Sequence, residues 1–219
     1  MQEHIVKSFD SELKDLTDKI VLLGQTCEQQ IENALTALTG SDHALAQQTV
    51  DKDAQVNELQ KEIEEEAIQC LAMRQPVAID LRQLLSVVKI ASKLERIGDY
   101  AANAASRVPK LTAAPQPETT DLIVQLGSTC KAMLTEIIAA FKTLDLQKAA
   151  ATWRRDNEVD TLFVQLVEMT QKQNEDIDDY TQLIFIGRYF ERIGDHITNI
   201  AEFIYYITTG QAYVDQFSK

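Results

Sequence analysis

The sequence is poor in residues that interrupt or cross-link a chain. Its 219 residues include seven Gly, four Pro and three Cys, while 45% of them are hydrophobic. This composition excludes a collagenous chain and argues against a largely disordered one. The cysteines, Cys27, Cys70 and Cys130, form no Cys-x-x-Cys pair of the kind that binds zinc or exchanges disulfides. We expect them to be small buried side chains of a protein in a reducing compartment.

Basic residues are also scarce. The chain has 21 Lys and Arg against 34 Asp and Glu, which gives a formal net charge of −13. Nucleic acids and anionic membranes are bound mainly through Lys and Arg, so the charge argues against both as partners. The first residues lack the basic and apolar regions of a signal peptide, and no run approaches the roughly 18 apolar residues of a membrane span. The sequence predicts a soluble cytoplasmic protein without a transmembrane segment.

Apolar residues recur at steps of three and four along most of the chain, which is the pattern of amphipathic helices. This periodicity predicts one helix from Leu13 to near Gly40, where a glycine follows the last apolar position. A second helix stops before Pro76, because the residue ahead of a proline is pushed out of helical geometry. A third helix follows it and runs to about Val108.

Three of the four prolines fall within residues 109–117, a segment that cannot continue a helix. We interpret it as a linker. After it the helical pattern restarts, and helices are expected near 118–142, 145–173 and 175–209, the last closed by Gly210. Apart from short ambiguous runs, nothing alternates with a period of two over the length of a strand, so the predicted fold class is all-α.

One motif occurs twice. The sequence Glu-Arg-Ile-Gly-Asp stands at residues 95–99 and again at 191–195, and at the same offset Asn103 matches Asn199. An identity of this length marks the duplication of a three-helix unit.

The repeat divides the chain into two similar parts. We expect two tandem three-helix bundles, six long helices in all, related by internal duplication. The first repeat is residues 1–108 and the second is residues 118–219, joined by the linker 109–117.

In each half, two successive helices carry acidic or amide side chains four residues apart. Side chains at this spacing lie one turn above each other on a single helix face, so each helix pair can direct four oxygen-bearing groups to one place. These pairs are Asp53 with Asn57, Glu95 with Asp99, Asp156 with Asp160, and Glu191 with Asp195.

Such stacking is unfavourable without a cation. Like charges at i and i+4 destabilise a helix by about 0.2–0.5 kcal/mol when exposed, and by more when they are removed from water. At about 100° per residue, Glu95 and Asp99 lie at the edge of the apolar arc of their helix. Half-buried carboxylates in this arrangement favour a divalent or trivalent metal ion, because carboxylate oxygens suit hard cations.

The glycines of the motif support a close contact at the same place. Gly98 and Gly194 each cost about 1 kcal/mol relative to Ala within a helix, and the missing side chain lets a neighbouring helix approach. The alternative is a solvated helix face without metal. In that case Arg96 and Arg192, which lie further round on the solvent side, neutralise the acids.

With these motifs the chain resembles the PhoU family, the accessory regulators of phosphate-specific transport in bacteria. The resemblance covers nearly the whole chain and is most specific at residues 94–101 and 191–202. Residues 74–82, with the sequence Arg-Gln-Pro-Val-Ala-Ile-Asp-Leu-Arg, also resemble the family's connection between the second and third helices.

The resemblance implies two tandem three-helix bundles, and in some family members multinuclear iron or zinc clusters bound through Glu/Asp-x-x-x-Asp motifs. The bound metal is expected to be iron, zinc, manganese or magnesium. Asn57 departs from the acidic form of the motif, so the first site is expected to bind metal more weakly. Carried over residue by residue, the candidate metal ligands are Glu95, Asp99, Glu191, Asp195, Asp53, Asp156 and Asp160.

The resemblance further implies a cytoplasmic adaptor without catalytic activity. It would act between the ATPase of the phosphate ABC transporter and a phosphate-sensing histidine kinase, and would restrain uptake and the starvation response when phosphate is plentiful. A homodimer is expected, as is a role in negative regulation. The chain has no Gly-rich phosphate loop, so direct phosphate binding is not indicated.

A metal-storage or redox helical carboxylate protein is the alternative function. Ferritin-like di-iron enzymes need Glu-x-x-His pairs, and none of His4, His43 and His196 follows a Glu at that spacing. His196 lies about 100° round the helix from Asp195, which favours a helix contact over metal ligation.

The last predicted helix is rich in aromatic side chains. Most are expected in the core, and contact with a dimer mate or partner is the alternative for some. They are Phe185, Tyr189, Phe190, Phe203, Tyr205 and Tyr206.

Overall fold

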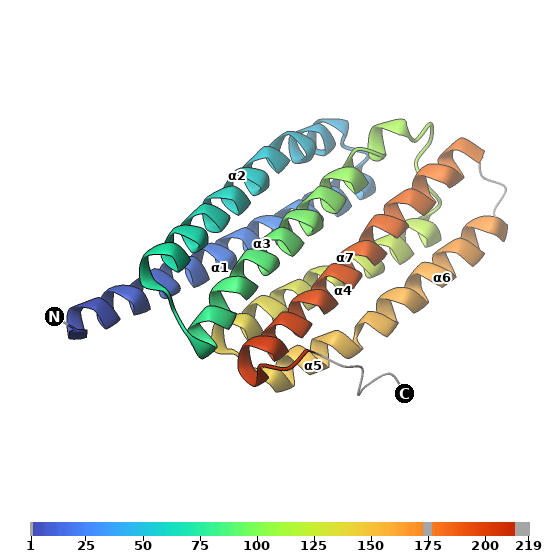
Figure 1. The fold of residues 1–219 in the computed structure, drawn as a ribbon. Coiled ribbons are helices and arrows are strands. Elements are labelled where there is room, and N and C mark those ends of the chain that lie inside the picture. The colour runs from blue at the N-terminus through green and yellow to red at the C-terminus, as the bar shows by residue number, and fades with distance from the viewer. Residues whose placement is uncertain (1, 173–176, 213–219) are drawn as a thin grey trace.

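The computed structural model describes residues 2–172 and 177–212, and within them every extended element is a helix (Figure 1). The all-α prediction is therefore confirmed. The elements are α1 (Gln2–Gly40), α2 (His43–Arg74), α3 (Ala78–Ala105), the short 3-10 helix η1 (Val108–Lys110), α4 (Pro117–Thr143), α5 (Leu146–Arg154), α6 (Asp156–Lys172) and α7 (Ile177–Thr209).

Local sequence explains where several helices begin and end. Asp42 precedes α2, and its carboxylate accepts a hydrogen bond from the backbone N–H of Leu45 at 2.9 Å. Asp145 caps α5 in the same way. Both are N-cap residues that satisfy otherwise unpaired N–H groups. Pro117 opens α4, because a proline in the first helical turn needs no N–H partner.

The single helix predicted over 145–173 is wrong in one respect, because it is divided into α5 and α6. At the break, the backbone N–H of Arg155 donates to the carbonyl of Thr152 at 3.1 Å, which tightens the last turn of α5. The break places Asp156 at the start of α6, where the helix dipole favours a carboxylate. The remaining predicted helices are present, although α1 begins at Gln2 rather than Leu13.

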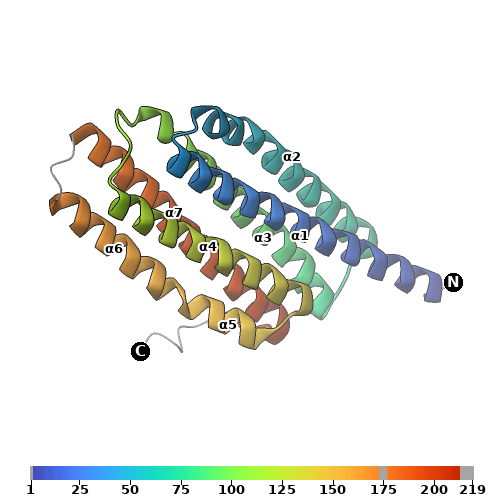
Figure 2. The same cartoon turned by 180° about the vertical axis from the view of Figure 1, so that it is seen from behind.

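The helices form two side-by-side bundles that share one continuous apolar core. The first consists of α1, α2 and α3, and the second of α4 to α7 (Figures 1 and 2). The bundles meet along two seams, because α3 packs against α7 and α1 packs against α4. Buried residues of both halves belong to one cluster. The seam between α3 and α7 joins the two helices that carry the repeated motif.

Helix α4 has a composition that needs an explanation. By length and hydropathy it is the one helix in the described residues that would be long and apolar enough to cross a membrane. Within that apolar window, 56% is buried inside the protein. Because α4 packs against α1, α5, α6 and α7, its apolar side chains serve the core.

The prediction that most aromatic side chains of the last helix lie in the core is wrong. Of that set only Phe190 is fully buried, while Phe185 is 42% exposed and the others are half-buried. Several line the seam with the first bundle, where the Arg107 guanidinium stacks on Phe185 at 4.5 Å. Arg107 also donates a hydrogen bond to the Tyr189 hydroxyl at 2.8 Å. Helical periodicity predicted that these aromatic side chains face inward. It did not show that several of them lie between the two bundles, where they are only partly buried.

Two glycines set the distance between α1 and α4. A methyl group added at Gly24 would lie 2.7 Å from Cγ1 of Ile138, and one added at Gly127 would lie 2.7 Å from Cδ2 of Leu35. Both are closer than carbon atoms approach, so these helices pack with no room for a side chain at either position.

We expect Gly24→Ala and Gly127→Ala each to lower the free energy of unfolding in urea. Crowding costs about 1–3 kcal/mol, which exceeds the gain of about 1 kcal/mol from helix propensity. Gly40→Ala is the matched control, because the nearest atom to its added methyl group is 4.0 Å away. If Gly24→Ala and Gly127→Ala stabilise the protein as much as Gly40→Ala does, the close contact is contradicted.

Candidate metal centres

The first acidic cluster lies between α2 and α3. The carboxyl groups of Asp53 on α2 and Asp99 on α3 lie close enough for each to affect the pKa of the other. Burial is the main cause that raises the pKa of both groups. The negative charge of Asp99 adds to the effect at Asp53, and that of Glu95 adds to it at Asp99.

Two amides orient Asp53. Gln30 on α1 donates from Nε2 to one carboxylate oxygen, and Asn57 donates from Nδ2 to the other, both at 3.2 Å. Gln30 is 3% exposed, and its Oε1 is buried without a hydrogen-bond donor. A buried acceptor beside a carboxylate is suited to a cation or a donor that enters the site.

The second cluster lies between α6 and α7 and is more strongly acidic. Burial, followed by the charges of Asp160, Asp195 and Glu191, raises the pKa of Asp156 to about 7. In the described part of the chain no side chain donates a hydrogen bond to Asp156. Burial also raises the pKa of Glu191, whose Oε2 is buried without a hydrogen-bond donor.

The two halves differ because the amides of the first are absent from the second. In the repeat, Gln30 corresponds to the buried Met133 and Asn57 corresponds to Asp160. Asp53 therefore has two donors, whereas Asp156 faces a further carboxylate. The second cluster carries the greater electrostatic cost and has the greater need for a proton or a cation.

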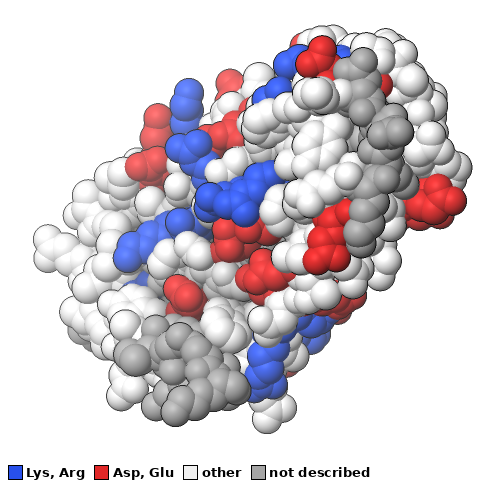
Figure 3. Space-filling model, turned by 90° about the vertical axis from the view of Figure 1, so that its right-hand side faces the viewer, with Lys and Arg blue, Asp and Glu red and all other residues white. Residues whose placement is uncertain are grey.

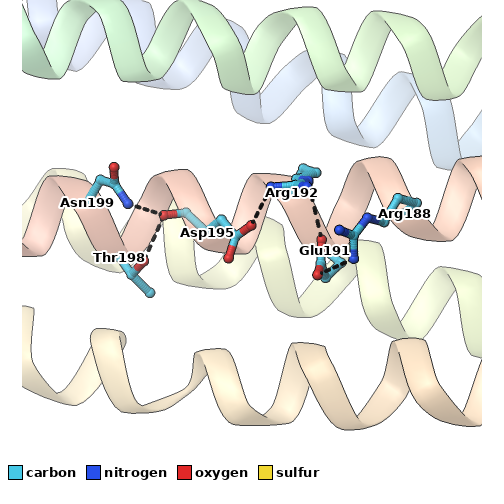
Figure 4. Close-up of polar contacts among 6 residues, drawn as sticks. All are labelled: Arg188, Glu191, Arg192, Asp195, Thr198 and Asn199. Atoms are coloured by element: carbon cyan, nitrogen blue, oxygen red, sulfur yellow. Dashed lines mark hydrogen bonds and ion pairs between the residues drawn. The ribbon is translucent and has the colours of Figure 1, made fainter. Parts of the chain in front are cut away.

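Arginines hold the motif acids from the solvent side in both halves. Arg188 Nη1 lies 2.6 Å from Glu191 Oε1, and Arg192 Nη1 lies 3.4 Å from Asp195 Oδ2 (Figure 4). Arg96 lies 3.4 Å from Asp99 in the same manner. On the face in Figure 3, Lys and Arg side chains lie directly beside Asp and Glu. This partial neutralisation is the arrangement expected of the arginines when no metal is bound.

The repeated asparagine has a structural role in the second half. Asn199 Nδ2 and Thr198 Oγ1 each donate to the backbone carbonyl of Asp195 at 2.7 Å (Figure 4). These bonds secure the turn of α7 that carries the acid.

Because Gly98 and Gly194 have no side chain, an acid of the preceding helix can approach each of them closely. A methyl group at Gly98 would lie 2.8 Å from Gln30 Oε1 and 3.4 Å from Asp53 Oδ1. At Gly194 it would lie 2.5 Å from Asp156 Oδ1. The expected close approach of a neighbouring helix is confirmed, and at both sites the neighbour presents oxygen atoms.

Two cysteines complete the repeat, although their sequence pattern did not single them out. The thiols of Cys27 on α1 and Cys130 on α4 donate to the backbone carbonyls of Leu94 and Phe190, each at 3.2 Å. Each carbonyl belongs to the residue directly before the motif. Both cysteines are fully buried, and burial raises the pKa of both thiols. The available signal was their common spacing of 26 residues before Asp53 and Asp156.

His196 makes a helix contact, as predicted. Its ring stacks on Tyr100 of α3, with 5.5 Å between ring centroids. Burial, followed by the charge of Lys93, lowers the pKa of His196 to about 4. The neutral ring lies in the α3–α7 seam.

The seven predicted ligand residues form these two clusters, one in each half. Over residues 2–172 and 177–212, no three His, Cys, Asp or Glu side chains form a group with metal-holding geometry. The motif acids form ion pairs with arginines instead. Metal binding stays a prediction, which the buried Oε1 of Gln30 without a hydrogen-bond donor and the raised pKa of Asp156 fit.

The chain is similar to known proteins over its whole length. The PhoU domain model matches residues 20–108 and 123–204. The chain is 38% identical to a phosphate-specific transport system accessory protein PhoU homolog of Caulobacter vibrioides, over 100% of this chain and 97% of that protein. It is 33% identical to the phosphate-specific transport system accessory protein PhoU of Serratia marcescens, over 96% and 88% of the two chains.

Solved structures are similar as well. The crystal structure of the phosphate transport system regulatory protein PhoU from Streptococcus pneumoniae has a TM-score of 0.89, with 31% identity over 94% of this chain and 99% of that one. PhoU from Pseudomonas aeruginosa has a TM-score of 0.87, with 33% identity over 93% and 100%.

We expect Asp156→Asn to stabilise the metal-free protein at high pH. The folded state holds a proton on Asp156 that the unfolded chain releases between about pH 4 and pH 7, so stability falls as the pH rises through this window. Discounted for partial exposure, the gain at about pH 8 is about 1 kcal/mol, or a rise of ~2–4 °C in Tm.

The measurement is thermal unfolding with a chelator present. At about pH 4 the difference between Asp156→Asn and the parent should nearly vanish. Asp121→Asn on the exposed face of α4 is the control and should show no such pH dependence. An equal effect of Asp156→Asn at both pH values would contradict the assignment.

Proposed function

The chain belongs to the PhoU family, and we propose that it is an accessory regulator of phosphate-specific transport that acts through protein contacts. The observation that carries this proposal is the extent of the similarity. Relatives named as accessory proteins of phosphate-specific transport systems match this chain over 96–100% of its length, which includes both bundles and the segment between them. Chain length and order of elements are thus those of an accessory protein.

In this proposal the protein is a cytoplasmic adaptor without catalytic activity. It contacts the ATPase of a phosphate ABC transporter and a phosphate-sensing histidine kinase, and it restrains uptake and the starvation response when phosphate is plentiful. Two features support a role without catalysis. The thiols of Cys27 and Cys130 are fully buried with raised pKa, and such thiols are poor nucleophiles. The motif arginines are engaged by neighbouring acids.

The acidic clusters are proposed to bind metal as a structural link between helices. Asp53, Glu95 and Asp99 would hold a cation between α2 and α3, and the four acids of the second cluster would hold one between α6 and α7. A bound cation supplies positive charge where the metal-free protein uses a proton. Oxygen donors favour hard cations, and the more acidic second cluster should bind more tightly.

Deletion of the gene tests the regulatory function. We expect deletion to raise phosphate uptake and alkaline phosphatase expression in phosphate-rich cells, because the restraint is lost. The parent gene on a plasmid should restore both. Unchanged uptake and expression in rich and in starved cells would contradict the proposed function.

Elemental analysis after reconstitution tests the metal sites. We expect Glu191→Ala with Asp195→Ala to lower bound metal more than Glu95→Ala with Asp99→Ala does, because the second cluster has the greater negative charge. The matched control is Arg192→Ala, which leaves the acids in place and should lower the content of bound metal least.

Unfolding curves of each variant separate loss of metal from loss of fold. Absence of metal from the reconstituted parent protein would contradict the metal proposal and leave the arginines as the only neutralising groups. Oxidation of ferrous iron with turnover would instead favour the metal-storage or redox alternative over the adaptor.

A further inference from the structure

Exposed apolar side chains are concentrated at the connection between α2 and α3. Five of the ten large hydrophobic residues that are exposed in the described chain lie within residues 73–85. Val77 is 73% exposed and is the second most exposed of the ten. A concentration of this kind on a surface indicates a site of interaction. We call it the elbow surface, and it consists of Met73, Val77, Ile79, Leu81 and Leu85.

The backbone that presents these side chains is strained. Gln75 has φ of 47° and Ala78 has φ of 52°, both in the left-handed region that favours glycine. Between them, the chain turns sharply and leaves Val77 in an extended conformation at the N-terminus of α3. Gln75 caps the end of α2 in this conformation as Leu144 caps the end of α4, whereas Ala78 adopts it at the start of a helix.

Three members of the elbow surface form a stripe. Leu81 and Leu85 are four residues apart on α3, so they lie one turn apart on one side of the helix, and Val77 is the extended residue directly before the helix begins at Ala78. The core face of α3 is separate, because Leu84 and Val87 are fully buried. An exposed stripe at this spacing is what an amphipathic partner helix contacts with its own apolar face.

Acidic hollows border the stripe. A hollow of about 300 Å³ is lined by Asp10, Asp80, Val77 and neighbouring residues. A second hollow of about 300 Å³, which reaches Met73, is lined by Asp15 and other acids. The carboxylates leave this part of the surface negative around its apolar centre.

The cations of this region already have partners. Arg74 is held by both carboxylate oxygens of Glu12, with contacts of 2.6 and 3.1 Å. Arg82 donates to the backbone carbonyl of Ile207 at 3.3 Å. Lys89, one turn beyond Leu85, lies over a ring of α7. Of the acids that line the two hollows, Glu12 is paired with Arg74 and Glu66 with Lys19, which leaves the carboxylates of Asp10, Asp15 and Asp80 for the cations of a partner.

We propose that the elbow surface docks a basic amphipathic helix of a partner protein. Apolar side chains of that helix cover Val77, Leu81 and Leu85, and its Lys or Arg side chains enter the acidic hollows. This inference deepens and rests on the proposed function, because an accessory protein needs a surface for its partner. A second copy of this chain would oppose like charges at Asp10 and Asp80, and an anionic bilayer would be repelled in the same way.

The test uses a labelled synthetic peptide of about 18 residues, with Leu on one helical face and Lys on the other, and the full-length protein. A peptide of the same composition with Leu spread around the helix is its control. By fluorescence anisotropy we expect the patterned peptide to bind about tenfold more tightly than the scrambled one.

Variants locate the binding. We expect Leu81→Gln with Leu85→Gln to weaken binding of the patterned peptide about tenfold. Leu22→Gln with Val164→Gln replaces two more exposed apolar residues, on α1 and α6, and should leave affinity within about twofold. Asp10→Asn with Asp80→Asn should weaken binding and reduce its salt dependence. Equal binding of both peptides, or of the parent and the Leu81 and Leu85 variant, overturns the proposal.

Two other ligands of the elbow surface, a second copy of this chain and lipid, would give different results. Light scattering that shows a dimer in the parent and a monomer in the Leu81 and Leu85 variant assigns the surface to a second copy and overturns the proposal. Binding to phosphatidylcholine or phosphatidylglycerol vesicles that this variant abolishes assigns it to lipid, with the same consequence.

Cells separate this inference from the proposed function. If gene deletion alters the phosphate response and the Leu81 and Leu85 variant fails to restore it while the Leu22 and Val164 variant does, the docking proposal is supported. Full restoration by the Leu81 and Leu85 variant overturns docking and leaves the proposed function intact. A deletion without effect overturns the proposed function, and the peptide measurement then stands alone as the test of the surface.

Discussion

The close contact of helices at Gly98 and Gly194 is the constraint on which the acidic clusters depend. Because neither residue has a side chain, α2 approaches α3 and α6 approaches α7 with oxygen atoms at the point of contact. The carboxylates of Asp53 and Asp156 are thereby removed from water and brought near the motif acids. The pKa values of these two carboxyl groups are raised by this packing. Ionisation of either group therefore lowers the stability of the folded protein.

Duplication preserved the packing but not the polar partners. Cys27 and Cys130 bind the same backbone position in the two halves, and both motif glycines face an acid. The amide of Gln30, in contrast, has only Met133 as its counterpart. The first half therefore offsets its buried carboxylate with hydrogen bonds, whereas the second relies on a proton or a cation. The two bundles are thus similar in packing but differ in the groups that surround the buried carboxylate.

The surfaces proposed for metal and for a partner are separate in the fold. The clusters occupy the middle of long helices, where neighbouring elements hold each side chain. The elbow surface lies where α2 passes into α3, with strain at Ala78 and an exposed Val77. Because α3 carries both Leu81 and Leu85 of the elbow surface and the first acidic motif, the proposed partner and the proposed cation would contact the same helix.

The amino-acid sequence by itself determined the helical class, the duplication and the identity of the clustered acids, because periodicity and repetition are properties of the chain. The break at Arg155, the half-buried aromatic side chains and the thiol contacts of Cys27 and Cys130 were decided only by the tertiary structure. Each depends on distances between helices, which the pattern along one helix does not contain. The same holds for Asp156, whose pKa is set by burial between α6 and α7 and by charges on both.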